Sequence, residues 1–69
     1  MKTIIEVGAN DGTDTQKFLT QDDMVVYAFE PTHELLGKLY DKFRNEPRVK
    51  IIPMAVELEP GFANFNIAS

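Results

Sequence analysis

The residues Glu6 to Gly12 constrain the fold of this chain more than any other part of the sequence. They read Glu-Val-Gly-Ala-Asn-Asp-Gly and follow directly on the apolar pair Ile4-Ile5. A glycine turn after a β-branched run is typical of the end of a buried strand, because glycine adopts backbone conformations that other residues avoid. A second strand-like run ends in Glu30, roughly 20 residues after Gly8. This order predicts a β-α-β unit with a ligand-binding loop after its first strand.

The middle of the chain continues the alternation of strands and helices. We expect strands over residues 3–7 and 24–29, a short helix over 13–19 between them, and a second helix that begins after Thr32. The second helix has the clearer apolar face, because its apolar residues recur at helical spacing. These residues are Leu35, Leu36, Leu39, Tyr40 and Phe43. A strand, a helix and a further strand in this order predict a parallel pair of strands.

Two further strands are expected in the C-terminal part. Residues 49–56 predict a third strand, with Pro53 near its end or at a bulge. After the turn signal Pro60-Gly61, the alternation over residues 62–67 predicts a fourth strand that returns antiparallel to the third. The expected fold class is α/β, with the order βαβαββ and a mostly parallel sheet.

The length of the chain limits how much of such a fold it can form. With 69 residues it makes one small domain at most, whereas an ordinary doubly wound sheet needs about twice as much chain. We therefore expect residues 1–69 to form a single truncated unit, which belongs to a larger fold or is completed by a partner. An unfinished parallel sheet leaves an exposed edge, and self-association through that edge would cover it.

Composition excludes several classes of function. The formal net charge is −4 and there is no cysteine. The acidic charge balance argues against nucleic acid or a membrane surface as a partner. The lack of cysteine excludes disulfides, thiolate catalysis and cysteine-based zinc sites. The longest apolar run is far shorter than the ~20 residues of a membrane span, and the first residues do not read as a signal peptide. We expect a cytoplasmic protein.

The glycine loop favours S-adenosylmethionine over a dinucleotide. Its spacing is Gly8-x-x-x-Gly12, without the middle glycine of the dinucleotide fingerprint, and Asp11 would place a carboxylate close to the phosphates of NAD or FAD. S-adenosylmethionine has no phosphate and carries a sulfonium cation, so Glu6 and Asp11 suit it better. An acid at the end of the second strand, Glu30, can accept both hydroxyls of a ribose. We expect the loop and Glu30 to face a common crevice that binds the adenosyl cofactor.

Simpler interpretations of the same residues remain open. Asp11-Gly12 can form a tight turn without any ligand, and Glu30 can be a solvated acid or an acid that caps the following helix. A calcium loop with Gly12 at its sixth position would need ligands at Val7 and Phe18, so no metal site is predicted. His33 is the only histidine, and without a paired acid or nucleophile it is most simply an exposed residue of the first helical turn.

Three blocks of the sequence carry a resemblance to a known family. They are Ile5-Glu6-Val7-Gly8-Ala9-Asn10-Asp11-Gly12, then Tyr27-Ala28-Phe29-Glu30-Pro31 followed by Glu34-Leu35, and finally Ile52-Pro53-Met54-Ala55-Val56 before a turn glycine and Phe65. In these blocks the chain resembles the N-terminal portion of the FkbM-type methyltransferases, which are S-adenosylmethionine-dependent enzymes of the class I, Rossmann-like fold. The resemblance implies a partial Rossmann-like unit whose last strand is antiparallel.

The resemblance also implies a role for individual residues. The residues around the methionine part of the cofactor would be Glu6, Gly8, Ala9, Asn10, Asp11 and Gly12. Glu30 would hold the ribose diol, Pro31 would shape the loop beside the adenosine, and Ala55 would fall near the adenine. Where most relatives begin the first block with Asp, this chain has Glu6, which keeps the charge and lengthens the reach. The chain stops before the acceptor-binding part of the family, so no catalytic residue is assigned.

The reaction implied by the resemblance is transfer of a methyl group from S-adenosylmethionine to an oxygen of an acceptor, expected to be a small molecule or a sugar. An alternative from another class is a noncatalytic binding or assembly module that forms a homo-oligomer through its exposed sheet edge. A third interpretation, half of a nucleotide-dependent oxidoreductase, is disfavoured by the missing middle glycine.

Overall fold

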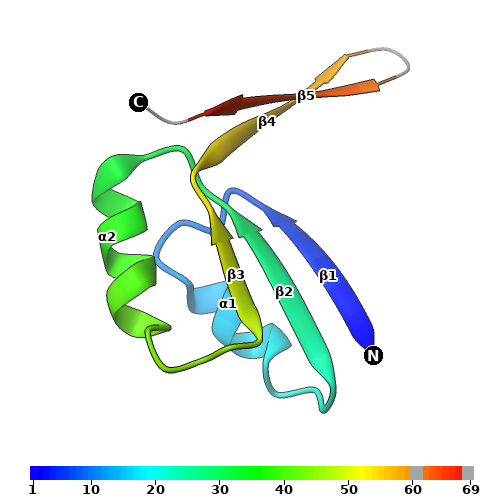
Figure 1. Ribbon diagram of the computed structural model, residues 1–69, viewed down its shortest axis with the longest axis vertical. Coiled ribbons are helices and arrows are strands. Elements are labelled where there is room, and N and C mark those ends of the chain that lie inside the picture. The colour runs from blue at the N-terminus through cyan, green and yellow to red at the C-terminus, as the bar shows by residue number, and fades with distance from the viewer. Residues whose placement is uncertain (60–61, 68–69) are drawn as a thin grey trace.

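The computed structural model describes the backbone of residues 1–59 and 62–67 and the side chains of residues 1–56. A three-stranded parallel sheet of order β1-β2-β3 is formed by β1 (Lys2–Val7), β2 (Met24–Phe29) and β3 (Val49–Ile52). Two helices, α1 (Thr13–Phe18) and α2 (His33–Lys42), connect these strands. A separate antiparallel hairpin is formed by β4 (Met54–Glu59) and β5 (Phe62–Ile67). Figure 1 shows this hairpin beyond the carboxyl ends of the parallel strands.

Both helices cover the same face of the parallel sheet. The register places Ile4, Val26 and Val49 side by side, so that these alternate residues share one face. That face packs against α2 through Leu39 and Phe43 and also contacts Phe18 at the end of α1. Adding strands in one direction through right-handed crossovers places successive helices on one face. The opposite face carries no helix in the described part of the chain (Figure 1).

The apolar face of α2 is narrower than the sequence indicated. Leu36, Leu39 and Phe43 are buried, as their spacing predicts, and Leu35 is half-buried. Tyr40 remains 49% exposed. Its position on the helix lies about 80° from the centre of the buried stripe, at the border of the apolar face.

Pro53 divides the predicted third strand. The expectation of one strand over residues 49–56 is wrong, because β3 ends at Ile52 and β4 begins at Met54 in a different sheet. Proline has no N–H to donate to a ladder, so the chain leaves the parallel sheet at this point. The antiparallel return is confirmed, with Met54 opposite Ile67 and Glu59 opposite Phe62. The turn signal Pro60-Gly61 lies outside the described residues.

The amino ends of the strands are joined by Arg48. Its guanidinium contacts the Glu46 carboxylate at 2.8 Å and donates to the carbonyls of Leu19 and Gln21 at 3.4 Å. Hydrogen bonds from Arg48 hold the pKa of Glu46 below its ordinary value. These contacts hold the loop before β2 against the loop before β3. The candidate site lies at the opposite, carboxyl ends of the strands.

The observed fold is therefore a small α/β unit with a three-stranded parallel sheet, two helices and a C-terminal hairpin. The predicted order is confirmed apart from the division of the third strand at Pro53. No helix among the described residues is long and apolar enough to cross a membrane.

Substituting Gly12→Ala should destabilise the fold. Gly12 has a φ of +90°, and a Cβ atom there would lie 2.6 Å from Cε2 of Phe43 and 3.1 Å from Cδ2 of Leu39. Backbone strain and overpacking together should lower the free energy of unfolding by about 1–3 kcal/mol. Gly37→Ala is the matched control, because Gly37 lies inside α2 and a Cβ there meets nothing within 4 Å. Urea unfolding followed by circular dichroism should show the control stabilised by about 0.5–1 kcal/mol.

Candidate functional site

The loop between β1 and α1 lies at the carboxyl edge of the parallel sheet and is attached to the end of β2. The backbone N–H groups of Gly8 and Ala9 both donate to the carbonyl of Phe29, at 2.9 and 3.0 Å. The N–H of Gly12 then donates to the carbonyl of Ala9 at 3.0 Å, which closes a turn. Loops at the carboxyl ends of parallel strands are where open α/β sheets bind ligands. The glycine loop occupies that position.

Three residues of this loop have left-handed backbone conformations. Their φ angles are +75° at Gly8, +55° at Asn10 and +90° at Gly12. Asparagine tolerates this region better than most residues with a side chain. A Cβ at Gly8 would meet nothing within 4 Å, so glycine is favoured there by the backbone conformation and not by neighbouring protein atoms. The space beside Gly8 is open for another molecule to approach the backbone.

Glu30 joins this loop to the second helix. Glu30 follows β2 directly and is only 3% exposed. One carboxylate oxygen accepts the N–H of Asn10 at 2.7 Å, and the other accepts the N–H of Thr32 at 3.1 Å. Thr32 is the N-cap residue of α2, so the carboxylate also lies at the positive end of that helix. The helix-capping interpretation of Glu30 is therefore realised, and the solvated one is wrong.

The loop and Glu30 lie together, yet the crevice expected between them is absent. The Asn10–Glu30 hydrogen bond closes the gap directly, and the described residues enclose no pocket. A carboxylate offers about four lone-pair positions, of which Asn10 and Thr32 occupy two. Glu30 retains the capacity to accept two hydroxyls, provided that its surroundings open enough to admit them.

Glu6 faces the first helix and not the outer side of the loop. Its carboxylate accepts a hydrogen bond from the hydroxyl of Thr15, which is fully buried in α1. Burial raises the pKa of Glu6, the hydrogen bond from Thr15 partly opposes this, and the nearby carboxylate of Asp14 raises the pKa further. The visible role of Glu6 is to connect β1 to α1.

Asp11 carries its charge on the outer rim of the loop. It precedes Gly12, the N-cap residue of α1, and accepts both the N–H of Thr13 at 3.1 Å and the hydroxyl of Thr13 at 2.7 Å. The hydroxyl contact is the main reason that the pKa of Asp11 is lowered, followed by the backbone contact. The loop therefore presents an exposed carboxylate that stays ionised well into the acidic range.

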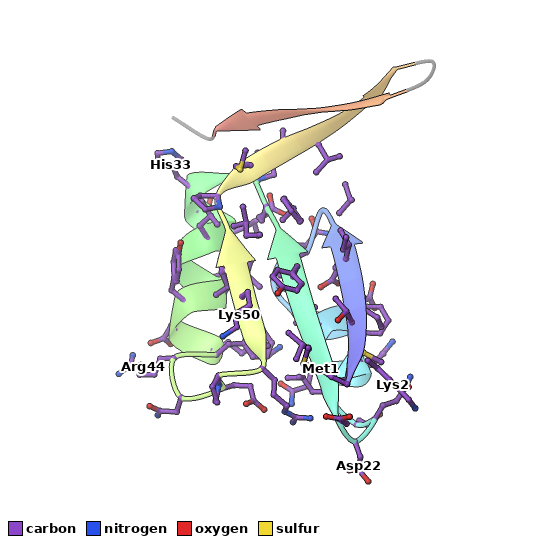
Figure 2. The ribbon with its side chains drawn as sticks, turned by 45° about the vertical axis from the view of Figure 1, so that its right-hand side comes forward. Met1, Lys2, Asp22, His33, Arg44 and Lys50 are labelled. Atoms are coloured by element: carbon purple, nitrogen blue, oxygen red, sulfur yellow. The ribbon has the colours of Figure 1, made fainter. Side chains whose placement is uncertain are left out.

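The other predicted site residues lie in different surroundings. Ala9 is buried in the core at 3% exposure, so a ligand could reach only its backbone. Pro31 is exposed between β2 and α2, next to Glu30. Ala55 is half-buried on β4, opposite Asn66 of β5, in the hairpin beyond this edge. Figure 2 shows His33 at the amino end of α2, directed away from the parallel sheet.

Two contributors to the site were not anticipated from sequence. Thr15 is the partner of Glu6, and the carbonyl of Phe29 holds the start of the loop. A signal for Thr15 did exist, because an acid within an apolar strand needs a polar partner once it is partly buried. The Phe29 carbonyl carries no such signal, since every residue has one.

The described residues contain no group of three or more histidine or acidic side chains that could hold a metal ion. The edge offers backbone groups and carboxylates, which suit a ligand that bears hydroxyls and a positive charge. Comparison of the chain with family models, curated proteins and solved structures gave no match.

Replacing Glu30 should destabilise the chain even without a ligand. In Glu30→Ala, the N–H of Asn10 loses its buried acceptor and α2 loses the carboxylate at its amino end. We expect the free energy of unfolding to fall by about 2–4 kcal/mol in urea titrations. Glu34→Ala is a suitable control, because Glu34 is also an acid of the first turn of α2 but is exposed. Equal effects of the two substitutions would contradict the bridging role of Glu30.

The raised pKa of Glu6 predicts a pH-dependent effect of Glu6→Gln. Because the folded pKa lies above the ordinary value of 4.5, the folded chain takes up a proton before the unfolded chain as the pH falls. The contribution of Glu6 to stability therefore rises as the pH falls through the folded pKa. Relative to the unmodified chain, Glu6→Gln should be more favourable at pH 7 than at pH 4 in urea titrations.

Asp11→Asn provides the opposite control for this measurement. The folded pKa of Asp11 is lowered, so its contribution is present above the ordinary pKa and is lost as the pH falls through the folded value. Asp11→Asn should accordingly be less favourable at pH 7 than at low pH. The same sign of pH dependence for both variants would contradict the assigned environments.

Proposed function

We propose that this chain is the cofactor-binding part of an S-adenosylmethionine-dependent methyltransferase of the FkbM type, which acts on an oxygen of a small-molecule or sugar acceptor. The observation that carries the proposal is the contact between Asn10 and Glu30 at 2.7 Å. It brings the glycine loop and the acid at the end of β2, which lie in separate blocks of the sequence, to one edge of the sheet.

The topology supports the finer proposal that the parallel sheet is one half of a Rossmann-like fold. Its order is β1-β2-β3, with each new strand added on the same side. A Rossmann-like sheet of order 3-2-1-4-5-6 contains this arrangement as its first half. In that fold the ligand crosses the carboxyl ends of the strands beside β1, which is where the glycine loop lies.

Each group at the edge has a proposed task in binding. Glu30 would accept the two ribose hydroxyls through the lone pairs that Asn10 and Thr32 leave unused. The open side of Gly8 would admit the ligand close to the loop backbone. The exposed carboxylate of Asp11 would attract the cationic part of the cofactor and repel the phosphates of a dinucleotide.

The chemistry supplied by the bound cofactor would be an activated methyl group, because the neutral thioether left behind by a sulfonium is a good leaving group. The remaining requirement is to align an acceptor oxygen in line with that methyl group. The described residues account for holding the donor, and we assign none of them to aligning the acceptor. We therefore propose donor binding for this chain and leave turnover to a complete acceptor site.

Isothermal titration with S-adenosylhomocysteine tests the proposal. The folded chain should bind it, and NAD should bind at least about tenfold more weakly because of the missing glycine and the charge of Asp11. Gly8→Asn should keep the fold, since asparagine tolerates a φ of +75° and meets no protein atoms there, but its side chain should block the ligand. Gly37→Ala, in the interior of α2, is the control that should leave binding unchanged.

A test of the role of Glu30 in binding needs a variant whose side chain keeps the shape of glutamate. Glu30→Gln retains one acceptor oxygen and should weaken binding of S-adenosylhomocysteine by about 10- to 100-fold, because a hydrogen bond to a charged group contributes about 1.5–3 kcal/mol. Circular dichroism must show that the variant is folded under the conditions of the titration. Absence of binding by the folded, unmodified chain, or tighter binding of NAD, would refute the proposal.

A further inference from the structure

One side-chain hydrogen bond spans the glycine loop from the strand before it to the helix after it. The hydroxyl of Thr15, in α1, donates to the carboxylate of Glu6, which lies next to the last residue of β1. The residues between these two partners include the whole loop from Gly8 to Gly12. The bond therefore closes a ring of the chain around the loop.

Both partners of this bond lie in packed parts of the fold. Thr15 is fully buried in α1. Glu6 is half-buried, and in the sheet it lies beside Ala28, a fully buried residue of the central strand β2. A carboxylate and a hydroxyl that lose water on folding are unfavourable unless they find a partner. Their pairing thus connects two well-packed elements, β1 and α1.

The other hydrogen bonds of the loop hold its first half. The N–H groups of residues 8–10 all donate to groups at the end of β2, which are the carbonyl of Phe29 and the carboxylate of Glu30. The N–H at the other end of the loop bonds back to a carbonyl of the loop itself. Among the described hydrogen bonds, the one between Thr15 and Glu6 is therefore the bond that attaches the far end of the loop, where α1 begins, to β1.

The backbone of the loop is unfavourable to order. Gly8, Asn10 and Gly12 have φ angles of +75°, +55° and +90°. Glycine loses more conformational freedom on folding than any other residue, and the left-handed region is uncommon for a residue with a side chain. A loop of this composition needs attachment at both ends to keep one conformation.

We propose that Thr15 is a positioning residue for the glycine loop. By holding the carboxylate of Glu6, its hydroxyl fixes the start of α1 relative to the end of β1, and this keeps the loop in the conformation that a ligand meets. Glu6 acts in this arrangement through Thr15, because its carboxylate is directed to α1. The effect on ligand affinity rests on the proposed function, whereas the effect on the order of the loop does not.

NMR relaxation of the backbone amides, measured without cofactor, tests the effect on loop order. In the unmodified chain the amides of Gly8, Ala9 and Gly12 should have order parameters of about 0.85, typical of a rigid backbone. Thr15→Val keeps the shape of the side chain and removes its hydroxyl. Since hydrogen bonds to charged groups are among the stronger ones in proteins, the order parameters of the loop should fall to about 0.6 or lower, while that of Val26 in the central strand stays unchanged.

Two further substitutions are controls for this measurement. Thr15→Ser keeps the hydroxyl and loses a buried methyl group, so it should restore the order of the loop. Thr20→Val is the matched control, because the hydroxyl of Thr20 donates to the carbonyl of Lys17 at 2.7 Å near the other end of α1. It should leave the loop unchanged. Equal effects of Thr15→Val and Thr20→Val would overturn the proposal, and so would a loop that stays rigid in Thr15→Val.

A double variant separates the loss of the bond from the presence of an unpaired charge. Thr15→Val leaves the carboxylate of Glu6 without its partner, which by itself is unfavourable. Glu6→Met combined with Thr15→Val removes both polar partners and keeps unbranched bulk at position 6, so the chain should be folded by circular dichroism. Its loop should still be mobile. A rigid loop in this variant would overturn the proposal, and the same comparison with Thr20→Val applies if Thr15→Val alone does not fold.

Isothermal titration of the same folded variants with S-adenosylhomocysteine tests the effect on binding. Thr15→Val should bind at least about threefold more weakly, because a smaller fraction of its chains has the loop in the binding conformation. Thr15→Ser should recover most of the affinity, and Thr20→Val should leave it unchanged. A mobile loop without loss of affinity would overturn the proposal. If the unmodified chain binds no S-adenosylhomocysteine while the loop responds as expected, the proposed function is refuted and the role of Thr15 in ordering the loop stands.

Discussion

The carboxylate of Glu30 is the group on which the arrangement of this edge depends. It holds the N–H of Asn10 from the loop after β1 and the N–H of Thr32 at the start of α2. A nearly buried carboxylate is unfavourable unless it is hydrogen-bonded, and these two contacts satisfy both of its oxygens. One side chain thereby connects the glycine loop to the start of the second helix.

This dual use of Glu30 affects how a ligand could be bound. The acid that is proposed to hold a ribose also organises the glycine loop, and the described residues enclose no pocket there. Binding of the proposed ligand would require Glu30, which is 3% exposed, to become accessible. Pre-organisation of this kind lowers the entropy lost on binding, and it also means that structural and ligand-binding effects of substitutions at Glu30 have to be measured separately.

The parallel sheet is asymmetric in a way that follows from its connections. Both helices lie on one face, so Ile5 and Val7 remain exposed on the other, and in the described part of the chain β1 pairs only with β2. The exposed apolar side chains and the outer edge of the described sheet both belong to β1. Two carboxylates lie at or just after the carboxyl end of β1. Glu6 is bonded to Thr15 of α1, and Asp11 lies on the rim of the glycine loop.

The sequence by itself determined most of the elements that form, because local pattern is enough for the first two strands and both helices. The β-branched runs, the spacing of Leu36, Leu39 and Phe43, and Thr32 as N-cap predicted the strands and the second helix. The placement of Gly8 and Glu30 also predicted that the loop and the acid lie at one edge, since parallel strands end on the same side. The exposure of Tyr40 and the departure of the chain at Pro53 into a second sheet depended on which strands lie nearby, and local pattern does not contain that information.

Only the tertiary structure decided how the groups at this edge contact one another. Sequence spacing could not show that Glu30 bonds to Asn10 and closes the expected crevice, or that Glu6 turns toward Thr15. These contacts join residues that are far apart in the chain, and their geometry is set by how α1 and α2 pack on the sheet. The same packing favours glycine at position 12, because a Cβ atom there would lie 2.6 Å from Cε2 of Phe43, which belongs to the second helix region and not to the loop.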